Sequence, residues 1–200
     1  MRARHSPEWR FPTPMSTGTI SFIPLRRCDA EAMLAWQYPP PYDFYNSRTG
    51  PTEAAVVELL ASVGQYFAVL DGTGQMVGFR SYGKAAQIEG GDYREPAVDI
   101  GGGLRPDMMA RGLGRRVAVA AINFAIRELG ARHLRSTLPM FNERARSICS
   151  SLGFRRWGSF TRPSDGVGFE IMTLAATPFS GPSPLGGGGG WGTSPGFKIP

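Results

Sequence analysis

The sequence predicts a mixed α/β layer fold, in which helices cover a central sheet that is not doubly wound. Strand-like and helix-like segments alternate along the middle of the chain in the order β-α-α-β-β-β-α-β-α-β-β. The 200 residues are 42% hydrophobic and 19% charged, which is ordinary for one domain with a real core. Residues 18–177 are expected to form this domain. Residues 1–17 and the Gly/Pro-rich residues 178–200 are predicted to be disordered, with Met15 as an alternative start.

The first third of the domain predicts a strand and two helices joined by a proline-rich loop. Residues 20–25 are a strand candidate, and Asp29 is expected to cap a helix that runs to about Gln37. The loop YPPPYDFYN (38–46) cannot be regular structure, because its prolines forbid a helix interior and a central strand. A second helix is expected over residues 52–62.

The middle third predicts three strands and a long helix. Residues 66–70 and 75–82 flank the turn DGTG, which is a strong hairpin signal. Residues 97–104 form a further strand that ends in three glycines and a leucine. The long helix covers residues 112–129, and its central part holds a single polar residue, Asn123. We therefore expect this helix to be covered on more than one side.

The last third predicts a strand, a short helix and a closing strand pair. The strand covers residues 133–138. Asn142 is expected to cap the helix, and Gly153 to end it. Residues 155–160 and 168–174 then pair around a turn that contains proline and glycine.

The charge and the scarce cysteines narrow the possible functions. A net charge of +6 favours anionic partners such as a polyanionic cofactor. Two cysteines and two isolated histidines provide neither a disulfide framework nor a metal site. The chain has no apolar run long enough to span a bilayer. It also has no secretory signal, and no basic stripe with interleaved aromatic residues of the kind that binds nucleic acid. We therefore expect a reduced, cytoplasmic, soluble protein that binds no metal, membrane or nucleic acid.

The segment PDMMARGLGRR (106–116) predicts an anion site at the start of the long helix. Free backbone N–H groups gather at a helix N-terminus, and glycines let a bulky anion approach them. Three arginines in this turn would each be unfavourable by about 0.3–1 kcal/mol in the empty protein, so they suggest a polyanion. A P-loop is excluded because Arg115 follows Gly114, and a dinucleotide fingerprint because Val117 stands at the third glycine position.

Two motifs resemble those of the GCN5-related N-acetyltransferase (GNAT) superfamily. Residues 104–115 resemble its acetyl-CoA signature, usually Gln/Arg-x-x-Gly-x-Gly/Ala, and the glycines before Leu-Arg-Pro look like a bacterial subset. Residues 142–154 resemble the second motif, Asn-x-x-Ala-x-x-x-Tyr-x-x-x-Gly-Phe. The order of elements over residues 20–174 matches the family, which implies six to seven strands and about four helices. Met109 and Cys149 depart from the usual Gln/Arg and Tyr.

The resemblance implies transfer of an acetyl group from acetyl-CoA to an amine by direct attack in a ternary complex. The alternative is a catalytically weak or inactive CoA-binding regulatory module of the same fold. In either case the protein is expected to be a monomer or a homodimer. The residues expected to bind the cofactor lie in the glycine turn and at the start of the short helix, with Arg116 as a further cation for the phosphates. They are Leu104, Arg105, Ala110, Arg111, Gly112, Leu113, Gly114, Arg115 and Asn142.

The catalytic residues are less clearly marked. Asp99 is expected either to be the base or to be a solvated side chain, with Glu170 and Glu89 as weaker candidates for the base. Cys149 is expected either to protonate the leaving thiolate or to pack as a small apolar residue. The Leu104 N–H is the candidate oxyanion donor. The aromatic loop after the first helix, with Tyr42 and Tyr45, is expected to bind the acceptor.

Overall fold

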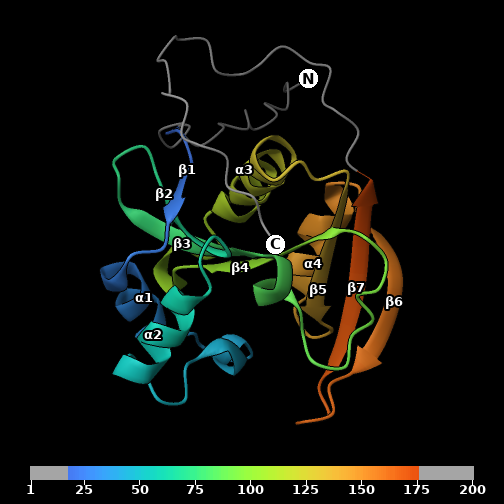
Figure 1. The fold of residues 1–200 in the computed structure, drawn as a ribbon, viewed down its shortest axis with the longest axis horizontal. Coiled ribbons are helices and arrows are strands. Elements are labelled where there is room, and N and C mark those ends of the chain that lie inside the picture. Colours follow the sequence, from blue (N-terminus) through green and yellow to red (C-terminus); the bar gives the residue numbers. More distant parts are fainter. Residues whose placement is uncertain (1–17, 176–200) are drawn as a thin grey trace, which may run out of the picture.

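The computed structural model describes residues 18–175. These residues fold around a seven-stranded sheet (Figure 1). Its order is β1-β2-β3-β4-β5-β7-β6, and every neighbouring pair is antiparallel except the parallel pair β4–β5. The strands are β1 (Ser21–Pro24), β2 (Tyr66–Leu70), β3 (Met76–Tyr82), β4 (Val98–Leu104), β5 (His133–Pro139), β6 (Arg155–Thr161) and β7 (Gly168–Ala175). The predicted α/β class is confirmed, whereas the expectations for residues 1–17 and 178–200 lie outside the described residues.

Four α-helices flank this sheet in the described part of the chain. They are α1 (Arg27–Leu34), α2 (Glu53–Ala61), α3 (Leu113–Glu128) and α4 (Glu143–Ser151). Val117, Ala121 and Ala125 of α3 are fully buried, and none of residues 117–126 is exposed. The apolar side of α4 packs against the same core, which is built on Tyr82, Ile100 and Leu134 of the sheet. No helix among residues 18–175 is both long and apolar enough to cross a membrane.

The start of α1 differs from the prediction that Asp29 caps it. The helix begins at Arg27 with Arg26 as its N-cap, and it ends at Leu34 rather than near Gln37. Asp29 is the third helical residue, and its carboxylate accepts the backbone N–H of Arg26 at 3.1 Å and the guanidinium Nε at 2.7 Å. An acidic side chain thus satisfies the first orphan N–H from inside the helix, as in a capping box.

The predicted cap at Asn142 is confirmed, and Thr52 caps the helix that is expected to begin there. Thr52 Oγ1 accepts the Ala55 N–H at the start of α2, and Asn142 Oδ1 accepts the Ala145 N–H at the start of α4. Gly153 follows α4 with φ +91°, a left-handed conformation that favours glycine. These local signals set the ends of α4, and α4 lies beside α3 in the fold.

Candidate active site

The parallel strands β4 and β5 separate after two residue pairs, and we call the region between them beyond that point the gap. Only Val98–Leu134 and Asp99–Arg135 are paired, after which β4 continues with β3 and β5 continues with β7 (Figure 1). The Arg105 N–H donates to Val77 of β3. Because successive residues of an antiparallel strand point their N–H groups to opposite sides, the Leu104 N–H points away from β3, toward the gap. The two strands thus separate before the glycines of β4 are reached.

The turn from β4 to α3 presents uncapped N–H groups beside this gap. Gly112 is the N-cap of α3 with φ +75°, and no side chain caps the first turn. A Cβ at Gly112 would meet no atom within 4 Å, so the left-handed backbone, not crowding, requires glycine there. Ala110 also has a positive φ of 61°. The turn thus directs several backbone donors at one place, which is the arrangement that binds anions.

The arginines of the turn divide into two groups. Arg111 and Arg115 are exposed and form no ion pair within residues 18–175. Arg116 donates to the Gly18 carbonyl at 2.8 Å. Arg105, expected to bind the cofactor, instead pairs with Asp107 at 2.6 Å and donates to the Met76 carbonyl. Arg105 therefore holds the turn in shape, and Arg111 and Arg115 are the cations left to receive an anion.

Gly114 has a packing reason to be glycine that the sequence did not reveal. A Cβ there would lie 3.0 Å from Cδ1 of Ile148, a side chain of α4. The second glycine of the turn therefore allows α3 and α4 to approach closely beside the gap. Asn142 is similarly committed to structure, since besides capping α4 it donates from Nδ2 to the Tyr45 hydroxyl at 2.8 Å.

Asp99 is buried in an ion pair and is not solvated. Arg135 donates from Nε to Oδ1 at 2.6 Å and from Nη2 to Oδ2 at 2.9 Å, and the Gln87 amide donates to Oδ2 at 2.8 Å. The side chain of Asp99 is 1% exposed. This pairing raises the pKa of Arg135 and occupies the carboxylate from both sides. The geometry favours a structural role for Asp99 over that of a base.

Cys149 faces the core from α4 and is partly buried. Burial raises the pKa of its thiol, while a hydrogen bond with Ser136 and the guanidinium of Arg80 oppose that change. The thiol is therefore protonated at neutral pH, as an acid would have to be. Arg80 was missed by the sequence analysis, although an arginine inside the apolar strand MVGFRSY was a signal that could have found it.

The aromatic loop spans the gap. The Tyr38 hydroxyl donates to the Leu104 carbonyl at 2.8 Å, and the Tyr45 hydroxyl accepts from Asn142 at the start of α4. Between them, the Tyr42–Tyr45 turn places the Tyr42 ring under the Arg144 guanidinium, 5.7 Å from the ring centre. Tyr42 and Tyr45 thus lie along one wall that joins β4 to α4.

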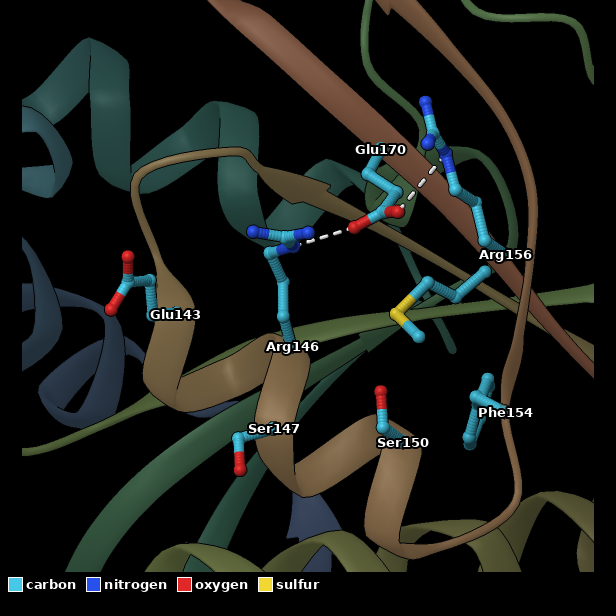
Figure 2. A pocket seen from close by; sticks show the side chains of 8 residues that line it. Glu143, Arg146, Ser147, Ser150, Phe154, Arg156 and Glu170 are labelled. Carbon is cyan, nitrogen blue, oxygen red and sulfur yellow. Dashed lines mark hydrogen bonds and ion pairs between the residues drawn. The ribbon is translucent and has the colours of Figure 1, made fainter.

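A separate hollow of about 360 Å³ lies between α4 and the strands β6 and β7. Figure 2 shows Arg146 and Arg156 on opposite sides of Glu170, at N···O distances of 2.5 and 3.2 Å. Glu170, a weaker candidate for the base, is 5% exposed and held by these two cations, whereas Glu89 lies on the surface. Within residues 18–175, no group of His, Cys, Asp and Glu side chains is suited to hold a metal ion.

Comparisons with known proteins agree with this geometry. The family model described as an acetyltransferase (GNAT) domain matches residues 20–155, more than half of the chain. An acetyltransferase of the GNAT family from Bacillus anthracis is 17% identical, with TM-score 0.58, over 78% of this chain and 94% of that one. Spermidine/spermine N-acetyltransferase SpeG from Vibrio cholerae, solved with manganese ions, is 14% identical, with TM-score 0.56, over 78% and 92%.

A third structure, provisionally described as a phosphinothricin N-acetyltransferase, is 16% identical, with TM-score 0.60, over 80% of this chain and 99% of that one. At these identities the structures show a shared fold. A comparison with curated protein sequences finds no significant match.

Proposed function

The chain belongs to the GNAT acetyltransferase family, and we propose that it transfers an acetyl group from acetyl-CoA to an amine by direct attack in a ternary complex. One observation carries the proposal. The strands β4 and β5 diverge beside an uncapped, arginine-flanked N-terminus of α3, so an anion site and a gap through the sheet lie together.

The coenzyme's phosphates fit the turn before α3. The N–H groups of Gly112, Leu113 and Gly114 lie at a helix start, and Arg111 and Arg115 bring positive charge without an ion pair among residues 18–175. Backbone N–H groups provide most of the contacts with the phosphates. Met109, at the position where the family usually has Gln or Arg, therefore weakens coenzyme binding without abolishing it. When bound, acetyl-CoA supplies the acetyl thioester.

The chain's own groups then orient the reaction in the gap. The Leu104 N–H, directed into the gap, is the donor we assign to the oxyanion of the tetrahedral intermediate. The Tyr38 hydroxyl donates to the Leu104 carbonyl, which belongs to the next peptide unit, and so restrains the backbone directly after this donor. Tyr42 and Tyr45 form part of the wall along which the amine enters.

Neither buried carboxylate considered as a base is free to accept a proton. Asp99 is paired with Arg135, and Glu170 with Arg146 and Arg156. We therefore assign deprotonation of the amine to water. The rate should then rise with pH up to the pKa of the amine itself, without the inflection near neutral pH that an enzymic base with a raised pKa would add.

The test is release of CoA by the full-length protein with acetyl-CoA and a panel of amines that includes polyamines and amino acids. Arg111→Ala with Arg115→Ala should raise the KM of acetyl-CoA and lower the calorimetric affinity for CoA. Arg155→Ala, which removes an exposed arginine of β6, is the matched control. CoA binding without turnover on any amine would indicate the regulatory module instead, and absence of CoA binding would refute both functions.

A further inference from the structure

One partly buried cation near the site has no role in the assignments above. Arg80 projects from the middle of β3, and its Nε is buried without a hydrogen-bond partner. Its Nη1 donates to the Gly101 carbonyl at 3.4 Å, which is long, and no carboxylate of residues 18–175 forms an ion pair with it. A guanidinium left this way is costly, because burial without a counter-charge disfavours the charged form.

The side chain of Arg80 lies close to the middle glycine of β4. A Cβ at Gly102 would lie 2.3 Å from the Phe79 carbonyl oxygen of β3 and 2.9 Å from Cδ of Arg80, and Gly102 has φ +128°. The β3 backbone and the left-handed conformation require glycine there, and the Arg80 side chain lies against it. The pairing of β4 with β5 has already ended at this point, so this part of β4 has no strand partner among residues 18–175 on its other side.

The neighbours of Arg80 come from three elements. Tyr82 on β3 and Cys149 on α4 interact electrostatically with its guanidinium, which itself donates to Gly101 on β4. The Tyr82 hydroxyl is already engaged with the Ala121 carbonyl at 3.1 Å, and Ser136 interacts with the thiol. The guanidinium thus lies within electrostatic range of the Cys149 thiol, which stands where the family usually carries a tyrosine acid, and no carboxylate of residues 18–175 forms an ion pair with it.

We propose that Arg80 is a catalytic residue of this reaction and stabilises the CoA thiolate as it leaves, in place of the missing tyrosine acid. This inference rests on the proposed function, which generates a new anion in the gap. The amine nitrogen forms a bond to the acetyl carbon, the carbon–sulfur bond breaks, and its electron pair goes to sulfur. The thiolate leaves as an ion pair with Arg80, and the proton of the attacking amine goes to water. A fixed cation that needs no reorganisation is an efficient stabiliser of such charge.

The test compares Arg80→Met, Arg80→Lys and Cys149→Ala in full-length protein that carries Cys28→Ser, because the exposed Cys28 would react with thiol reagents. Arg80→Met should lower kcat about 100-fold, the scale for loss of one electrostatic stabiliser, with little change in the KM of acetyl-CoA. Arg80→Lys should retain part of the rate, and Cys149→Ala most of it. Arg155→Met, on the exposed edge strand, should behave as wild type.

A second readout does not depend on turnover. The pH dependence of Cys149 alkylation by iodoacetamide, followed by peptide mass spectrometry, should move to higher pH in Arg80→Met, because the neighbouring cation is lost. The melting temperature should not fall, since the substitution removes an unpaired buried charge. Unchanged kcat in Arg80→Met, or a loss confined to the KM of the amine, would overturn the proposal.

The two proposals fail differently. If wild type binds CoA but acetylates no amine, the catalytic role of Arg80 falls with the proposed function, although the alkylation shift would still be observed. If wild type turns over and Arg80→Met does so equally well, the proposed function stands and the role of Arg80 is refuted. An unchanged alkylation profile would show that the guanidinium does not face the thiol.

Discussion

Substitution of Asp99 by asparagine separates a structural carboxylate from a catalytic one. The side chains of Asp99 and Arg135 are 1% and 4% exposed, so solvent cannot screen the charge left behind. An asparagine keeps the shape but turns one oxygen into an NH₂ group, which would face the donors of Arg135 or Gln87. The variant therefore has an uncompensated buried guanidinium and a donor–donor contact.

The size of the effect follows from this burial. Removal of one partner from a buried, hydrogen-bonded ion pair costs about 3–5 kcal/mol. For a domain of this length each kcal/mol lowers the melting temperature by roughly 2–4 °C, so Asp99→Asn should melt about 6–20 °C below wild type. The double variant Asp99→Leu with Arg135→Met should recover much of the loss, because it replaces both charges with apolar groups.

Thermal denaturation, followed by circular dichroism, measures this directly, and CoA release at a temperature well below the transition measures activity. If Asp99 is structural, folded Asp99→Asn should retain a pH–rate profile of the wild-type shape. A variant that melts within about 2 °C of wild type, yet loses most of its kcat, would refute the structural reasoning and restore Asp99 as the base.

Three further outcomes are expected. Gly102→Ala should destabilise the fold by at least about 2 kcal/mol in urea denaturation, because its Cβ would clash with the β3 backbone at a positive φ. Tyr38→Phe should lose about 0.5–1.5 kcal/mol with the hydrogen bond to Leu104, and should lower kcat more than the KM of acetyl-CoA. Arg162 lowers the pKa of Asp165 to about 2, so the extra stability of wild type over Asp165→Asn should be full above about pH 4 and vanish toward pH 2 in acid titration.

The elements were predictable where short-range signals decide them. Thr52 and Asn142 cap helices that begin one residue later, and the turn at residues 71–74 is a hairpin. Asp29 misled because aspartate suits both the cap and the third helical position, and only its bond to the Arg26 N–H distinguishes the two. Local patterns therefore predict that a helix forms, but they locate its first residue only to within about one turn.

The site was less predictable because its partners lie far apart in the sequence. Asp99 and Arg135 are 36 residues apart, and no local pattern couples them. Gly114 was read as a ligand contact, but the packing of Ile148 equally requires it. The unpaired state of Arg80 depends on three strands and a helix that meet in space, so it became visible only in the folded chain.

The last pair of the β4–β5 ladder, Asp99 and Arg135, also sets where the two strands part. Under the proposed function, this buried pair bounds the region beyond the ladder on one side. We therefore expect Asp99 and Arg135 to limit the length of the acyl group that the protein accepts, and variants that shorten both side chains to accept longer acyl donors.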